Sequence, residues 1–218
     1  MYRLIRTGLF VAATLALTLL LAACTIGSDT LLVASTEGVT PLPDHFVMFP
    51  YEEQDSGAYT RSHDDPASFT RQGNQYVSAD MPDTKGSMSV RLLPAGRNAY
   101  LLAVLLPDEA GAIYGFAHYT NGVLVLALTP DDATTAALAA ARKGATGDAL
   151  AALDDLSISS GTGAITVKSR AALDYLISAY AAGHLPLDKL SVAYLAPDAK
   201  STLPKQIVAD GEGWKVVP

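Results

Sequence analysis

The sequence predicts an α+β fold, in which an antiparallel β-meander of six or seven strands is followed by two or three helices packed on the sheet in a single domain. Two patterns predict it. From His45 to Thr129 the apolar residues recur with a period of two, which is the period of strands. After Thr129 the period becomes 3.6, which is that of amphipathic helices. Strands followed by helices in this order are typical of α+β folds.

The strands are predicted from alternating apolar runs and from the turns between them. Residues 46–51 form the first run, and Gln72-Gly73-Asn74 separates the next two. Asn121-Gly122 is typical of a two-residue type I′ hairpin, which would pair Tyr119 with Leu124. Both faces of this hairpin are apolar, so each needs a cover. Further strands are expected at residues 88–92, 99–106, 165–167, 190–195 and 214–217.

Helices are expected in the second half of the chain. Thr129 as N-cap and Pro130 in the first turn predict a helix that ends at Lys143-Gly144. A short helix is expected at residues 148–156. Ser169 predicts the start of another, which ends at Gly183 and should pack on the sheet. Its apolar residues fall on one stripe: Leu173, Leu176, Ile177 and Tyr180.

Residues 1–23 have the layout of an export signal, with Arg3 and Arg6 before the 17 uncharged residues from Thr7 to Ala23. This run is borderline in length for a permanent transmembrane helix. Leu21-Ala22-Ala23-Cys24 resembles the lipobox of bacterial lipoproteins. An ordinary signal anchor is the alternative interpretation.

The resemblance implies that the Cys24 thiol receives a diacylglycerol, that the signal is cut just before it, and that the new amino terminus is acylated. It also implies a location in the cell envelope. Because Thr25 rather than Asp follows the cysteine, the resemblance implies the outer membrane, with the domain facing the periplasm. Beyond the lipobox, hairpins followed by Ala-rich helices resemble small proteobacterial lipoproteins.

Three regions are therefore expected along the chain. Residues 1–23 form the signal peptide, residues 24–43 carry the lipid and form a flexible tether, and residues 44–218 form the globular α+β domain. The tether is expected because residues 25–43 mix Gly, Ser, Thr and Pro without clear periodicity, although Leu31-Leu32-Val33 could form a short strand.

Charge and cysteine usage narrow the possible partners. Without Arg3 and Arg6 the chain has 13 basic and 22 acidic residues, a net charge of −9, which argues against nucleic acid and anionic headgroups. Cys24 is the single cysteine, so an internal disulfide and a thiolate zinc site are excluded.

No catalytic residue, cofactor or metal ligand is predicted, because none of the usual nucleophile, zinc or phosphate-loop motifs is present. The acidic stretch around His63-Asp64-Asp65, with Glu52, Glu53 and Asp55, is the best candidate for a cation site, but a solvated loop is favoured. His118 is expected in a strand, and His184 is expected to follow the end of a helix. Four tyrosines could line a ligand groove or stand at sheet edges: Tyr76, Tyr100, Tyr114 and Tyr119.

The function expected from these observations is a non-enzymatic binding domain that is anchored to the membrane through Cys24 and contacts an envelope protein or the cell wall. Two alternatives remain open. One is a cell-envelope hydrolase whose triad is assembled by the fold around His45, His63 or His118. The other is a small-ligand or cation-binding module centred on the acidic loop.

Overall fold

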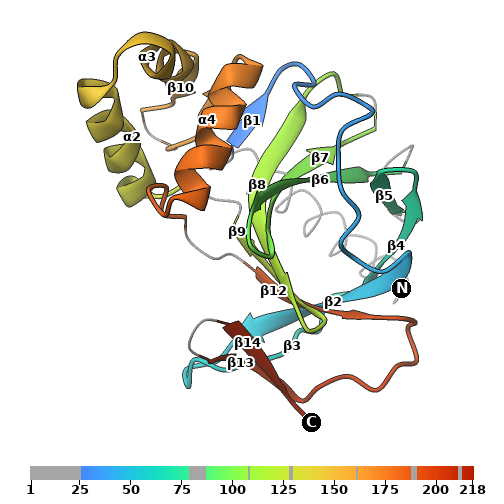
Figure 1. Cartoon of the computed structure of the whole chain (residues 1–218). Helices are drawn as coiled ribbons and strands as arrows, with labels where there is room; N and C mark the ends of the chain where they lie inside the picture. Colours follow the sequence, from blue (N-terminus) through green and yellow to red (C-terminus); the bar gives the residue numbers. More distant parts are fainter. Residues whose placement is uncertain are drawn as a thin grey trace, which may run out of the picture.

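The computed structural model describes residues 26–78, 87–107, 109–127, 130–160, 162–187, 191–210 and 213–218. A closed barrel of eight antiparallel strands forms its centre (Figure 1). The barrel strands, in spatial order, are β2 (His45–Glu53), β4 (Ala67–Gln72), β5 (Gln75–Ser78), β6 (Ser89–Gly96), β7 (Ala99–Leu105), β8 (Ala112–Thr120), β9 (Val123–Ala127) and β12 (Ser191–Ala196).

The barrel overturns the predicted fold class. The described chain is mostly β, with a closed barrel, six further strands and three short helices, instead of a meander sheet covered by helices. Strand β12 closes the sheet into a barrel, because it pairs with β9 on one side and with β2 on the other. The further strands are β1 (Ile26–Ser28), β3 (Tyr59–Arg61), β10 (Leu156–Ile158), β11 (Ile165–Val167), β13 (Gln206–Asp210) and β14 (Gly213–Val217).

Closure follows from the two apolar faces of the strands. The predicted hairpin register is confirmed, with Tyr119 opposite Leu124 and His118 opposite Val125. A sheet that is apolar on both faces must cover both, and a barrel lets one face cover itself. Helices and extra strands then cover only parts of the outer face.

The three helices of the described ranges lie together on one side of the barrel (Figure 1). They are α2 (Asp132–Gly144), α3 (Gly147–Asp154) and α4 (Arg170–Ala181). Helix α2 begins later than predicted, because Asp131 is the N-cap and forms a capping box with Thr134. Ser169 caps α4 as predicted, since its Oγ accepts a hydrogen bond from the backbone N–H of Ala172 at 3.2 Å.

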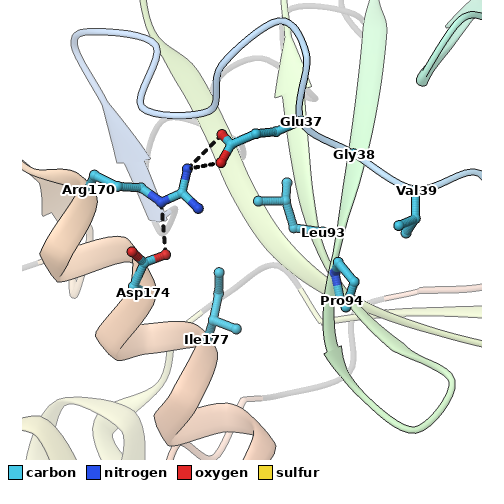
Figure 2. Close-up of a pocket in the computed structure, with 8 residues that line it drawn as sticks. All are labelled: Glu37, Gly38, Val39, Leu93, Pro94, Arg170, Asp174 and Ile177. Carbon is cyan, nitrogen blue, oxygen red and sulfur yellow. Dashed lines mark hydrogen bonds and ion pairs between the residues drawn. The ribbon is translucent and has the colours of Figure 1, made fainter.

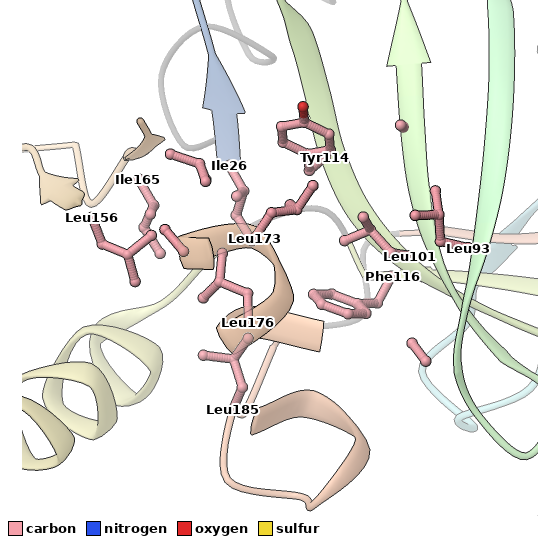
Figure 3. Packing of buried hydrophobic residues seen from close by; sticks show 14 of the residues in the cluster. Ile26, Leu93, Leu101, Tyr114, Phe116, Leu156, Ile165, Leu173, Leu176 and Leu185 are labelled. Atoms are coloured by element: carbon pink, nitrogen blue, oxygen red, sulfur yellow. The ribbon is translucent and has the colours of Figure 1, made fainter. Parts of the chain in front are cut away.

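Helix α4 packs its apolar stripe against the outer face of the barrel. Leu173 and Leu176 are fully buried there, beside Leu101 of β7 and Phe116 of β8 (Figure 3). Figure 3 also shows Ile26 of β1 in this cluster, next to Ile165 of β11. On another part of the barrel wall, β13, β14 and β3 cover the outer faces of β2, β9 and β12.

The predicted flexible tether is folded over its described part, residues 26–43. Ile26 is fully buried in β1, which pairs with β8 and β11. Side chains of the barrel then bind the segment that follows: the Arg91 guanidinium donates to the Val33 carbonyl at 3.0 Å, and the Asn74 amide donates to the Glu37 carbonyl at 2.7 Å. Residues 26–43 are therefore part of the folded domain.

A glycine allows this segment to approach the barrel. Gly38 has φ +131°, and a Cβ at this position would lie 2.7 Å from the Asn74 carbonyl oxygen. The next residue, Val39, forms an isolated antiparallel bridge with Leu92 of β6. The segment thereby occupies the edge of β6 that β5 leaves unpaired, since β5 pairs with β6 only through Tyr76 and Val77.

Candidate functional site

The interior of the barrel is the candidate site. Along each strand alternate side chains point inward, and the register aligns them into rings around the barrel. The inward cluster is apolar: Phe46, Phe69, Tyr76, Val90, Leu92, Leu102, Ala117, Leu124 and Leu195 are buried. Seven further apolar residues pack against it and are only half-buried: Met48, Ala67, Met88, Tyr100, Val104, Tyr119 and Leu126.

Leu42 occupies one end of the interior. The Tyr76 hydroxyl accepts a hydrogen bond from the Leu42 N–H at 2.9 Å and donates one to the Leu42 carbonyl at 2.7 Å. Phe46 packs against the rings of Phe69 and Tyr76, with centroids 5.3 and 5.5 Å apart. Aromatic rings and Leu42 therefore fill this end, where the short hairpin turns at residues 73–74, 97–98 and 121–122 also lie.

At the opposite end the inward side chains are less covered. Met48, Ala67, Met88, Val104 and Leu126 are all half-buried apolar residues of the interior cluster. They stand on five different strands or strand ends around the barrel. Small-molecule sites are lined mainly by apolar side chains such as these.

Charge is confined to the two rims of the interior. Among the described inward positions, Arg71 stands at the Leu42 end and pairs with Asp44 at 2.8 Å. Glu52 stands beyond the opposite end and is exposed, where its carboxylate accepts a hydrogen bond from the Ser62 hydroxyl at 2.5 Å. Burial raises the pKa of Tyr76 to about 12, so this phenol is neutral at physiological pH.

A concavity of about 330 Å³ lies outside the barrel, between α4 and the segment at Glu37. Figure 2 shows Arg170 between two carboxylates: its Nη1 lies 2.6 Å from both Glu37 oxygens, and its Nε lies 2.8 Å from Asp174 Oδ1. The Arg170 guanidinium lowers the pKa of Glu37. Because two carboxylates neutralise the one guanidinium, we interpret this concavity as a clamp between α4 and the N-terminal segment rather than an anion site.

The candidate residues named from the sequence do not come together. His45 is exposed, with its Nδ1 3.1 Å from Thr70 Oγ1, and His63 is exposed in the loop after β3. His118 points outward near Tyr180, with ring centroids 5.9 Å apart, and burial lowers its pKa. His184 follows α4 and is exposed. No histidine of the described ranges forms an ion pair with a carboxylate.

The acidic stretch at residues 52–65 is mostly exposed. Within the part of the chain that the structure describes, no group of three or more His, Cys, Asp or Glu is placed to hold a metal ion. Cys24, the predicted lipidation site, lies outside the described residues. No helix of the described ranges is long and apolar enough to cross a membrane.

Two of the four tyrosines bind the N-terminal segment. Tyr76 holds Leu42 from inside the barrel. Tyr114, on the outer face and fully buried, has its hydroxyl in a hydrogen bond with Ser28 Oγ at 3.1 Å and accepts one from the Leu32 N–H at 3.4 Å. Tyr100 and Tyr119 are half-buried members of the interior cluster.

No protein-family model, curated protein or solved structure matches this chain. The candidate site therefore depends on the geometry of the interior. Sequence reasoning missed the interior because it predicted a meander sheet covered by helices and did not predict that the sheet closes into a barrel. A signal was available: the hairpin at Asn121-Gly122 is apolar on both faces, and an apolar run at residues 190–195 was free to close the sheet.

Proposed function

We propose that this chain is a lipid-anchored protein of the bacterial cell envelope whose barrel binds a small apolar molecule without converting it. The proposal of ligand binding is based on the apolar interior of the barrel. Its Leu42 end is filled, and the apolar side chains at its other end are only half-buried. A barrel of eight strands is just wide enough for its own side chains or for one small ligand. The ligand would therefore lie at the end lined by Met48 and Met88.

The anchoring part is supported by the sequence alone. Arg3 and Arg6, the uncharged run and Leu21-Ala22-Ala23-Cys24 together resemble a lipoprotein signal. Two or three acyl chains on Cys24 would make detachment from the membrane negligible, because a single chain already contributes about 0.8 kcal/mol per buried CH₂ group. We propose the outer membrane as the location, with the domain facing the periplasm.

The fold limits the distance between the proposed lipid anchor and the folded domain. Only Thr25 separates Cys24 from Ile26, which is fully buried in β1. Two residue steps span at most about 7 Å, so an acylated Cys24 would hold β1 directly against the bilayer. A barrel held there would be next to a reservoir of apolar molecules.

Binding is favoured over hydrolysis by the surroundings of the histidines. A triad needs a histidine that is hydrogen-bonded both to a nucleophile and to a carboxylate. His45 contacts Thr70 at the exposed surface, and His118 faces Tyr180 on the outer wall. An envelope protein or cell-wall partner stays a prediction, which crosslinking in intact envelopes would test by comparing wild type with Cys24→Ser.

The binding proposal is tested with the chain from residue 24 onward carrying Cys24→Ser, which retains every described residue without lipid. N-phenyl-1-naphthylamine, a neutral dye that fluoresces in apolar surroundings, should bind with saturation. Met88→Trp, which adds a bulky ring at the end of the interior opposite Leu42, should weaken binding at least tenfold. Saturable binding that Met88→Trp leaves unchanged would place the dye elsewhere and contradict the proposal, as would the absence of binding.

The anchoring proposal is tested by intact-mass measurement of the protein isolated from bacterial envelopes. The expected mass is that of residues 24–218 plus a diacylglycerol and one further acyl chain. An intact leader, or a Cys24 thiol without acyl groups, would contradict it.

A further inference from the structure

Ser78, the last residue of β5, carries a buried hydroxyl for which the structure gives no partner. Its side chain is 1% exposed, and its Oγ forms no hydrogen bond with the described residues. Only its backbone is paired, since the Ser78 N–H donates to the Met88 carbonyl at 2.9 Å. A buried hydroxyl without a partner destabilises the fold, because its hydrogen bonds to water are lost without replacement.

The other buried serines of the described ranges are satisfied. Ser28 Oγ donates to the Thr30 carbonyl at 2.6 Å, and Ser62 Oγ donates to Glu52 Oε1 at 2.5 Å. The orphaned hydroxyl of Ser78 is therefore an exception within this chain and needs its own explanation.

The register places Ser78 on the inner face of the barrel. It stands opposite Phe69 of β4 and two residues after Tyr76, and both of these belong to the interior cluster. Side chains two apart on a strand share a face, so Ser78 also points inward. Along β5 it lies farther than Tyr76 from the end occupied by Leu42, and its backbone is paired with the half-buried Met88, the residue before β6.

The surroundings of Ser78 select an uncharged ligand. Between the two rims no described inward position carries a charge, and Arg71 at the Leu42 end is already paired with Asp44. A carboxylate or ammonium group placed beside Ser78 would lose its hydration without gaining a counter-charge. A neutral oxygen needs only the one hydrogen bond that Ser78 can provide, as donor or acceptor.

The interior that Ser78 faces also contains two flexible apolar side chains, which suit a flexible ligand chain. Met48 and Met88 are both half-buried members of the interior cluster. Unbranched thioether side chains adapt to ligands of differing shape. Phe69, opposite Ser78, is 5% exposed and provides a rigid wall toward the filled end.

We propose that the interior binds a neutral, mainly apolar molecule that carries one hydrogen-bonding oxygen, such as an aliphatic alcohol, ketone or ester, and that Ser78 Oγ pairs with this oxygen. This inference rests on the proposed function and specifies its ligand. The hydroxyl is left unpaired in the fold because the ligand is its partner.

The test uses the same Cys24→Ser chain and displaces bound N-phenyl-1-naphthylamine with hexan-1-ol, n-hexane or hexanoate. For each variant we take the ratio of its affinity for hexan-1-ol to its affinity for n-hexane, and we compare this ratio with that of the unsubstituted protein. The difference in hydrophobicity between the two probes is the same for every variant, so it cancels in that comparison. Ser78→Ala should reduce this ratio about fivefold to tenfold. Ser28→Ala, which removes a buried serine hydroxyl outside the barrel, should leave the ratio unchanged.

The outcomes distinguish a failure of the role given to Ser78 from a failure of the proposed binding function. If the dye binds and Met88→Trp weakens its binding at least tenfold, but Ser78→Ala keeps the wild-type ratio, the role of Ser78 is wrong and the binding function stands. If no dye binds to the wild type, both are wrong. Hexanoate binding as tightly as hexan-1-ol would contradict the neutral ligand class.

The fold of each variant is checked by its melting temperature. Should Ser78→Ala fail to fold, Ser78→Cys keeps a side chain of similar size with a weakly hydrogen-bonding sulfur. The expected reduction of the ratio in Ser78→Cys is then twofold or more, and an unchanged ratio would overturn the inference.

Discussion

Tyr76 connects the interior of the barrel to the segment that fills one end of it. Its ring packs against Phe46, and its hydroxyl is bonded to both the N–H and the carbonyl of Leu42. One phenol thus satisfies two buried backbone groups that have no strand partner. At the residue scale, this is the contact that fixes which end of the interior is filled.

Tyr76→Phe removes both hydrogen bonds while keeping the ring. The free energy of unfolding should fall by about 1–3 kcal/mol, because the Leu42 N–H and carbonyl would remain buried without partners. Urea denaturation measures the change. Tyr100→Phe is the matched control, since Tyr100 is a half-buried tyrosine of the same interior cluster, and it should cost less than about 0.5 kcal/mol. Equal effects of the two substitutions would contradict the role given to Tyr76.

The buried phenols also predict a loss of stability at alkaline pH. Burial raises the pKa of Tyr76 and of Tyr51 from 10 to about 12. Because the folded state holds these protons more tightly than the unfolded chain, their contribution is complete below pH 10 and is lost as the pH rises from about 10 to about 12.

Urea midpoints at about pH 9 and pH 11.5 measure this loss. The double variant Tyr51→Phe, Tyr76→Phe should lose less stability over that interval than the wild type does. Burial also raises the pKa of Tyr119 and Tyr180, so part of the dependence should remain. An identical loss in the double variant would show that other groups cause it.

At the scale of elements, the helices are attached to the barrel through α4. Its N-cap residue Ser169 is bonded to the Ala172 N–H, and its first residue Arg170 binds Glu37 of the N-terminal segment at 2.6 Å. The start of α4 therefore joins three parts of the fold: the helix, the segment and, through Leu173, the barrel wall.

Removing the cap by Ser169→Ala should destabilise the protein by about 1 kcal/mol, as measured by thermal or urea unfolding. Thr146→Ala at the N-cap of α3 is the control, because the Thr146 side chain makes no capping hydrogen bond. It should change stability by no more than a few tenths of a kcal/mol. A larger effect at Thr146 than at Ser169 would contradict the capping assignment.

Individual elements could be predicted from the sequence because their signals are local. The Asn121-Gly122 turn set the register of β8 and β9, and Asn121 has the positive φ of 52° that a type I′ turn requires. Ser169 marked the start of α4 for an equally local reason. The strand β13 (Gln206–Asp210) was missed, because it is short and its pairing with β14 and β3 is decided by tertiary contacts.

At the scale of the whole molecule, the prediction of a meander sheet covered by helices was wrong for a physical reason. Closure depends on β12 meeting β2, a pairing of Val192 with Tyr51 across 140 residues of chain that no local pattern encodes. The same closure creates the candidate site, so neither the interior nor the orphaned Ser78 could be placed from local patterns alone. The segment at residues 26–43 was also predicted wrongly, because hydrogen bonds to Tyr76, Arg91 and Asn74, which are distant in sequence, hold it on the barrel.

The central claim is that the interior of the barrel accepts a small apolar molecule at the end lined by Met48 and Met88. Methyl NMR of the methionine-labelled Cys24→Ser chain, titrated with hexan-1-ol, tests this directly, with the signals assigned by Met48→Leu and Met88→Leu. We predict that both methyl resonances shift progressively and saturate together. Resonances that stay unchanged while the alcohol is added to saturation would contradict the claim.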